Sequence, residues 1–361
     1  MERAVEPINV ADYERMAAER LDAGVLAYFA GGAGDELTMR ENVAAYRRWR
    51  LRPRMLVDVG ETSTATTVLG REVSMPILVA PVAFQALAHP DGEPGMARAA
   101  AAVGTIMNLS TAATARPADV AAAAPGGRRW FQLYCFRDRA VSDALVAEAV
   151  ESGFEAIVVT VDAPRAGKRE RDLRTGFRVP PEASVPSVEA ATGARQPISV
   201  AELFALVDPT LTWSDLDRLV DGCDVPVLVK GILRSDDAEL AVEHGAAGIV
   251  VSNHGGSQLD GAPATVEALP EIADAIAGRC EILVDGGIRR GTDVLIALAL
   301  GATAVQVGRP ALWGLAVGGE AGARRVLELL RDEVDLALAL LGCRSPAEVR
   351  PDHVRRLTPG L

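Results

Sequence analysis

Hydrophobic and polar positions follow a repeating pattern along most of the chain. From residue 76 onward, short β-branched apolar runs each end in a polar or glycine position, and an Ala-, Leu- and Glu-rich stretch follows each run. Apolar runs of this kind are typical of parallel strands that are covered by helices. We count eight of them: Pro76–Pro81, Thr105–Ser110, Trp130–Tyr134, Ala156–Asp162, Pro226–Lys230, Gly248–Ser252, Glu281–Asp285 and Ala304–Gly308.

Eight strand–helix repeats predict an α/β fold of the (β/α)8 type, a TIM barrel spanning residues 76–361. A doubly wound open sheet is the alternative, and the count of eight makes it less favoured. Residues 1–75 precede the first strand and predict a helical extension packed on the barrel, with a helix over Val10–Tyr28.

The connection between the fourth and fifth strands, about residues 163–225, is unusually long. Its middle, Arg178–Pro197, is rich in Pro, Ala, Ser and Gly and shows little periodicity. Long loops inside compact domains are usually either lids over a site or disordered segments. We interpret this one as a lid loop, with a disordered insertion of no role as the alternative.

Composition narrows the class of protein. The chain has 361 residues and is 49% hydrophobic, and its 49 acidic and 37 basic residues give a net charge of −12. This balance argues against binding to nucleic acid or to an anionic membrane surface. The start, Met1–Pro7, has no apolar signal core, and no apolar run is long enough to span a bilayer. Four scattered cysteines without a CxxC pair predict a reduced, cytoplasmic protein without a zinc or disulfide framework: Cys135, Cys223, Cys280 and Cys343.

The most informative stretch is Val250–Asp260, in which a buried strand runs into His254 flanked by glycines. Side chains at the carboxyl ends of barrel strands gather at one mouth, so this histidine is a candidate base there. The other strand ends contribute a ring of polar and backbone groups: Ala80, Pro81, Ser110, Gln132, Tyr134, Thr160, Asp162, Lys230, Ser252, Asp285, Gly308 and Arg309.

The loops after the last two strands predict a phosphate site. Asp285–Gly291 follows the seventh strand and Gly308–Pro310 the eighth, and both combine glycine with arginine. Glycines let backbone N–H groups approach an anion, and arginines pair with its oxygens. The alternative is two tight turns with solvated arginines. Lys230 ends an apolar strand, where it could stabilise negative charge on a cofactor or substrate, or merely pair with Asp285.

These motifs together resemble the FMN-dependent α-hydroxy acid oxidase/dehydrogenase family, which includes glycolate oxidase, lactate oxidase and mandelate dehydrogenase. Within that family the chain looks most similar to bacterial hydroxymandelate oxidases. The resemblance runs from Tyr28–Glu36 to Val305–Pro310, and its most specific parts are Ser252-Asn-His-Gly-Gly, Leu283-Val-Asp-Gly-Gly-Ile-Arg and Phe131-Gln-Leu-Tyr134.

The resemblance implies FMN across the barrel mouth. Lys230 would face N1 of the flavin, and the phosphate end would lie at the loops after the last two strands. The residues implied in cofactor binding are Ala80, Pro81, Val82, Ala83, Ser110, Gln132, Thr160, Lys230, Ser252, Asp285, Gly287, Arg289, Gly308 and Arg309. Ala83 stands where oxidases of the family tend to have alanine and dehydrogenases glycine, which favours oxygen as electron acceptor.

The same resemblance implies the chemistry. His254 would accept a substrate proton while hydride equivalents pass to flavin N5, and Asp162 would support the imidazolium. Tyr134 would hydrogen-bond the substrate oxygen, and Arg169 would bind the substrate carboxylate. The family also implies a homotetramer or larger assembly.

Two positions depart from the family pattern. The arginine that clamps the substrate carboxylate is replaced by Ser257, and the tyrosine usual in the first helical segment is replaced by Leu26, so a second carboxylate contact is missing. Serine offers one short hydroxyl and no charge. Leu26 makes the pocket more apolar, which favours an aromatic or bulky substrate.

Three functions therefore stay open. The first is FMN-dependent oxidation of an aromatic or bulky α-hydroxy acid, of mandelate or hydroxymandelate type. The second is the same flavin chemistry on a neutral or carrier-bound substrate without a free carboxylate. The third is an FMN-binding protein with little turnover, against which the complete set of His254, Asp162, Tyr134 and Lys230 argues.

Overall fold

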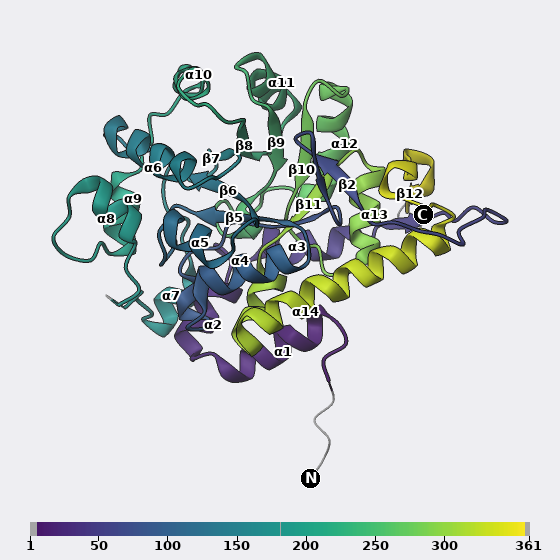
Figure 1. Cartoon of the computed structure of the whole chain (residues 1–361), viewed down its shortest axis with the longest axis horizontal. Coiled ribbons are helices and arrows are strands. Elements are labelled where there is room, and N and C mark those ends of the chain that lie inside the picture. The colour runs from purple at the N-terminus through teal and green to yellow at the C-terminus, as the bar shows by residue number, and fades with distance from the viewer. Residues whose placement is uncertain (1–5, 181, 358–361) are drawn as a thin grey trace, which may run out of the picture.

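The computed structural model describes residues 6–180 and 182–357, and its centre is a closed barrel of eight parallel strands (Figure 1). The strand order β10-β11-β4-β5-β6-β7-β8-β9 closes the ring. Each strand lies within or overlaps one of the eight apolar runs, so the prediction of a (β/α)8 barrel is confirmed. The strands are β4 (Ile77–Val79), β5 (Ile106–Ser110), β6 (Arg128–Leu133), β7 (Ile157–Thr160), β8 (Val227–Ile232), β9 (Gly248–Val251), β10 (Glu281–Val284) and β11 (Ala304–Val307).

Helices surround the barrel and bury the outer faces of its strands. The inner faces form a separate apolar core that includes Ile106, Trp130 and Leu228. Successive strand residues point to opposite faces, so a strand buried on both sides is apolar throughout. The helices that follow the eight strands are α4 (Gly92–Ala102), α5 (Pro117–Ala123), α6 (Arg139–Glu151), α10 (Trp213–Asp221), α11 (Ser235–Glu243), α12 (Thr265–Ile276), α13 (Gly291–Ala299) and α14 (Arg309–Leu341).

The N-terminal part packs against the barrel, and α1 lies along α14 (Figure 1). The predicted helix over Val10–Tyr28 is two helices, because the chain turns extended at Leu21. Residues 1–5, for which the sequence predicts no signal core, lie outside the described residues. The elements here are α1 (Val10–Arg20), α2 (Ala23–Ala30), α3 (Leu37–Tyr46), β1 (Trp49–Leu51), β2 (Thr66–Val68) and β3 (Arg71–Val73).

Three features of this part and the C-terminal part were not predicted. The hairpin β2–β3 packs Val68 and Val73 against the inner core of the barrel, and the Leu69 N–H donates to the Glu281 carboxylate at the start of β10. The hairpin therefore closes the amino-terminal end of the barrel. Strand β1 pairs antiparallel with β12 (Val354–Arg356), and α14 is interrupted at Gly318–Gly319.

The long connection between β7 and β8 carries short helices before α10, as seen at the edge of Figure 1. They are α7 (Glu170–Thr175), α8 (Pro186–Thr192) and α9 (Val200–Leu206). Helix α8 lies inside Arg178–Pro197, so this stretch contains a short helix that its composition did not predict, and its interpretation as part of a lid loop stays a prediction. Pro186 at the first turn and Gly193 in the left-handed conformation at its end delimit this helix.

Candidate active site

Two adjoining cavities occupy the carboxyl-terminal mouth of the barrel. The larger, about 400 Å³, is bordered by the ends of β5, β6 and β7 and by the segment that follows β7. The smaller, about 130 Å³, is bordered by the loops after β10 and β11. Five residues border both cavities, so one elongated ligand can span them: Pro81, Val82, Lys230, His254 and Arg309.

His254 stands between the two cavities at the end of β9. Its Nδ1 lies 2.8 Å from Asp162 Oδ1, and its Nε2 lies 3.4 Å from the Tyr134 hydroxyl. Burial opposes the charge on Asp162, but His254 and Lys230 outweigh that effect and lower the pKa of its carboxyl. A carboxylate at Nδ1 leaves Nε2 as the nitrogen that faces the larger cavity.

The backbone of His254 is in the left-handed conformation, with φ of +58°, and Gly255 and Gly256 follow it in the same region. This conformation is costly for a residue with a side chain. Two serines hold it: the His254 N–H donates to Ser252 Oγ at 3.1 Å, and Ser257 Oγ donates to the His254 carbonyl at 2.7 Å.

Tyr134 is buried at the wall of the larger cavity, and burial raises the pKa of its phenol. The hydroxyl therefore stays protonated near neutral pH and can donate a hydrogen bond. Its ring packs against Phe204 of α9, with ring centroids 5.8 Å apart.

Lys230 is buried beneath both cavities. Its ammonium donates to Ser252 Oγ at 2.8 Å and lies 3.3 Å from Asp285 Oδ2. Burial would lower the pKa of Lys230, but Asp285 and Asp162 outweigh it and raise the pKa, so the lysine is charged. Ser252 does not border either cavity; its hydroxyl supports Lys230 and His254 from behind, and its contact with the cofactor stays a prediction.

The larger cavity offers unused hydrogen-bonding groups where a flavin ring would lie. Gln132 Oε1 accepts from Ser110 Oγ and from the Thr111 N–H, both at 3.2 Å, but Gln132 Nε2 has no partner among the described residues. Thr160 Oγ1 is likewise without a protein partner within residues 6–180 and 182–357. Buried polar atoms are nearly always paired, so these point to a polar ligand.

The smaller cavity has the chemistry of an anion site. Gly287, Gly308, Arg289 and Arg309 border it. Burial lowers the pKa of Arg289; burial, with the charges of Arg289 and Arg169, lowers the pKa of Arg309 to about 9. Two cations held close together in a partly buried pocket favour a bound anion such as a phosphate.

Arg309 also has a structural task that the sequence did not reveal. Its guanidinium donates to the carbonyls of Phe29 at 2.9 Å, Gly31 at 2.7 Å and Gly255 at 2.9 Å. It therefore ties the end of α2 to the loop that carries His254.

One predicted substrate contact is misplaced. Leu26 is not among the residues that border the larger cavity, whereas Tyr28, two residues further along α2, is. The Arg169 guanidinium lies over the Tyr28 ring, 5.1 Å from its centroid, and donates to the Tyr28 carbonyl at 3.2 Å. Both aromatic residues of this helix, Tyr28 and Phe29, therefore border the cavity, and the motif Tyr28-Phe-Ala-Gly-Gly already contained them.

Several other predicted residues border one of the two cavities, and their contacts with ligands stay predictions. Arg169 and Ser257 border the larger cavity, and Ala80 and Asp285 border the smaller one. Sequence reasoning missed the wall formed by the segment after β7. Its members are Lys168, Asp172, Leu173, Val200, Leu203 and Phe204.

The fold and the two cavities are those expected of a TIM-barrel oxidoreductase that binds a phosphorylated flavin. The chain matches the family described as FMN-dependent dehydrogenase over residues 17–356. It is 49% identical to the L-lactate oxidase of a Nostoc species, over 93% of this chain and 95% of that protein. It is 48% identical to glycolate oxidase 3 of Arabidopsis thaliana, over 97% and 96%.

A solved mandelate oxidase variant with (S)-mandelic acid is similar in structure, with a TM-score of 0.89 at 43% identity, covering 99% of this chain and 100% of that one. The chain therefore belongs to the FMN-dependent α-hydroxy acid oxidase/dehydrogenase family, and its cofactor is FMN. Among the described residues, no helix is both long and apolar enough to cross a membrane.

Proposed function

We propose that the protein oxidises an aromatic or bulky α-hydroxy acid, of mandelate or hydroxymandelate type, to the corresponding 2-oxo acid. One observation carries this proposal: the His254–Asp162 pair and Tyr134 lie at a cavity that also has large apolar side chains in its lining. These include Leu173 of α7 and Phe204 of α9. An aromatic substituent buried there would contribute the binding free energy that a methyl group or hydrogen cannot.

Each residue has a definite part in the reaction. His254 Nε2 takes the proton of the substrate hydroxyl, and the Asp162 carboxylate stabilises the imidazolium that forms. Tyr134 donates a hydrogen bond to a substrate oxygen. FMN, when bound, would supply the hydride acceptor for this oxidation. Lys230, which borders both cavities, would hold the cofactor there and offer positive charge to the negative charge that develops on it.

Arg169 supplies the positive charge for the substrate carboxylate. Its guanidinium rests on the Tyr28 ring, forms no ion pair within the described ranges and borders the cavity. A guanidinium without a carboxylate partner can bind a substrate carboxylate through two parallel hydrogen bonds.

The test is anaerobic mixing of the FMN-loaded protein with (S)-mandelate, L-lactate and glycolate while the flavin absorbance is followed. We expect mandelate to bleach the flavin fastest. Faster bleaching by glycolate than by mandelate would overturn the assignment of an aromatic substrate.

We further propose that oxygen reoxidises the cofactor. Ala83 borders the larger cavity, and it stands where oxidases of the family tend to have alanine and dehydrogenases glycine. Turnover in air should release one hydrogen peroxide for each 2-oxo acid formed. Reduced flavin that persists for minutes in air-saturated buffer would point to another electron acceptor.

A second candidate function is the same oxidation of a neutral or carrier-bound substrate. Ser257 carries no charge, and its hydroxyl is used by the His254 carbonyl. Asp172 adds a carboxylate to the same cavity, with its Oδ1 buried and without a partner among the described residues. A carboxamide N–H could donate to that oxygen. Mandelamide that reduces the flavin faster than mandelate would favour this candidate.

A further inference from the structure

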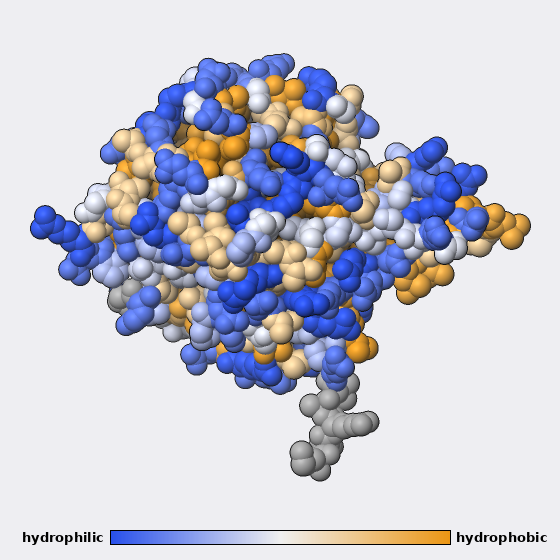
Figure 2. All heavy atoms as spheres, in the orientation of Figure 1, coloured by the Kyte–Doolittle hydropathy of each residue, from blue (hydrophilic) through white to orange (hydrophobic). Residues whose placement is uncertain are grey.

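A second cavity, of about 470 Å³, lies on the outside of the barrel wall. It is enclosed by the outer faces of β7 and β8, by α10 and by the loop that leads into α10. Thr160 borders both this cavity and the active-site cavity, so the barrel wall is the partition between them. Figure 2 shows hydrophobic surface among polar side chains in this region, between α6 and α10.

The walls of this cavity are mainly apolar. Helix α10 contributes Leu216 and Leu219, and the barrel contributes Val161 and Ile232. Trp213 stands at the start of α10 and stacks on His244, with ring centroids 5.7 Å apart. A volume of this size is in the range of small-molecule sites, which are mostly apolar with a few polar groups.

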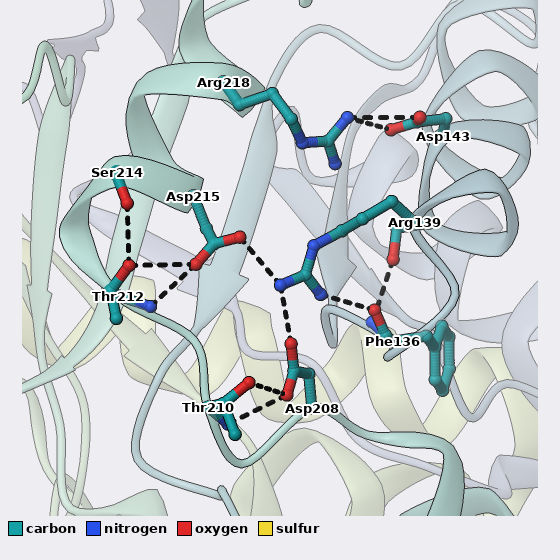
Figure 3. Close-up of polar contacts among 10 residues, drawn as sticks. Phe136, Arg139, Asp143, Asp208, Thr210, Thr212, Ser214, Asp215 and Arg218 are labelled. Carbon is teal, nitrogen blue, oxygen red and sulfur yellow. Dashed lines mark hydrogen bonds and ion pairs between the residues drawn. The ribbon is translucent and has the colours of Figure 1, made fainter.

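The polar groups at one rim form the cluster drawn in Figure 3. The Arg139 guanidinium of α6 lies 2.6 Å from Asp208 and 2.7 Å from Asp215. The backbone and hydroxyl of Thr210 donate to Asp208, and those of Thr212 donate to Asp215. One guanidinium therefore serves two carboxylates that border the cavity.

The other cations nearby pair with carboxylates outside this rim: Arg234, whose charge also acts on Asp237, pairs with Asp236. The guanidinium of Arg218 points to Asp143, 3.0 Å away, as Figure 3 shows. On the other side of the cavity, Asp237 of α11 borders it, and within the described ranges its carboxylate has neither an ion pair nor a hydrogen-bond donor. Three carboxylates therefore border the cavity, those of Asp208, Asp215 and Asp237. Arg139 pairs with the first two.

We propose that this cavity binds a small organic cation with an apolar body, such as an arylalkylamine. The apolar body would lie between Leu216, Leu219 and Ile232, and the ammonium would pair with the Asp237 carboxylate. The acidic rim would attract a cation and would repel an anion of the same shape. This site is separate from the proposed oxidation and does not depend on it.

The test is isothermal titration of the FMN-loaded protein with three probes of matched shape: phenylpropylamine, phenylpropanol and phenylpropionate. We expect the amine to bind about tenfold or more tightly than the alcohol, since a charge-assisted hydrogen bond is stronger than a neutral one. Leu219→Trp, which puts a larger side chain into the cavity, should weaken binding of the amine. Asp237→Asn should bring the amine to the affinity of the alcohol.

Two results would overturn the proposal. One is equal affinity for the three probes, and the other is amine binding that Leu219→Trp leaves unchanged. If Leu219→Trp does not fold, Asp237→Asn still tests the proposal, because the Asp237 carboxylate lies at the edge of the cavity without a partner in the described chain. An undiminished preference of Asp237→Asn for the amine would show that the probe binds elsewhere. A crystal soaked with phenylpropylamine should show it between α10 and β8.

Discussion

His254 is the residue that we propose as the base, and its surroundings suit that role. Its left-handed backbone is held by Ser252 on one side and Ser257 on the other, and Asp162 fixes its ring. A strained backbone persists only where neighbouring contacts determine it, and such positions are common at functional sites.

His254→Ala should therefore remove the base and leave the cofactor site in place. We expect flavin reduction by (S)-mandelate to slow by about 10²–10⁴-fold, the usual contribution of a positioned general base. Stopped-flow absorbance measures the rate, and the FMN content of the purified variant serves as the control. A variant that is reduced near the parent rate would exclude His254 as the base.

Ser257→Arg should place a second guanidinium against the substrate carboxylate. If the natural substrate is a free acid, kcat/KM on mandelate should rise by about ten- to a hundredfold through tighter and better oriented binding. If the substrate is neutral, the unpaired cation should lower activity on the matching amide.

Ser257→Ala is the matched control for that change, because it removes the hydrogen bond to the His254 carbonyl without adding charge. We expect Ser257→Ala to slow the reaction on acids and amides alike. If Ser257→Arg and Ser257→Ala behave identically on both substrate types, residue 257 acts through the His254 backbone and does not contact the substrate.

At the scale of elements, the sequence predicted the eight barrel strands because parallel strands buried on both faces appear in a sequence as short apolar runs. It did not predict β1, β2, β3 or β12, which are three-residue strands whose pairing depends on contacts far along the chain. Helix α8 was missed for a related reason: its seven residues are too few to show a helical period.

The Arg139 cluster fastens the end of the segment after β7 to α6, and it should be sensitive to pH. Hydrogen bonds from Thr210, together with Arg139, lower the pKa of Asp208 to about 2. A carboxyl whose pKa is lower in the folded state stabilises the fold above its unfolded pKa, and this contribution is lost as the pH falls toward 2.

Asp208→Asn should consequently lower the Tm by about 2–4 °C at pH 7, and the difference from the parent should shrink between pH 4 and pH 2. Thermal unfolding followed by circular dichroism at several pH values measures both quantities. Asp143→Asn, at the exposed pair with Arg218, is the control and should change the Tm by less than about 1 °C. A pH-independent difference for Asp208→Asn would mean that its charge does not matter.

At the scale of the whole molecule, the site is assembled from parts that the sequence could not bring together. The polar ring at the strand ends was predictable because barrel topology places it there. The contributions of the N-terminal part were not predictable in this way. Tyr28, and not Leu26, borders the cavity, and Asn42 of α3 forms reciprocal 2.8 Å amide hydrogen bonds with Asn253. A Cβ on Gly287 would stand 1.9 Å from the Asn42 carbonyl, so this glycine serves the packing of α3 as well as the anion site.

Because the proposed cofactor position lies where the barrel loops and the N-terminal part meet, FMN binding should stabilise the whole chain. A ligand at a hundred times its Kd stabilises the folded state by about 2.7 kcal/mol. For a chain of 361 residues this corresponds to a rise in Tm of about 3–4 °C over the apoprotein. Riboflavin lacks the phosphate that Arg289 and the glycine loops would hold, so at the same concentration we expect a rise of less than about 1 °C.

Differential scanning fluorimetry of the apoprotein with FMN, FAD and riboflavin measures this ranking. The matched variant is Arg289→Met, which keeps the length and apolar stem of the side chain and removes its charge. It should weaken the response to FMN and leave the response to riboflavin unchanged, because only FMN presents a phosphate to that position. Equal stabilisation of the parent by FMN and riboflavin would show that the smaller cavity does not bind the phosphate, and a larger rise with FAD would contradict the cofactor assignment.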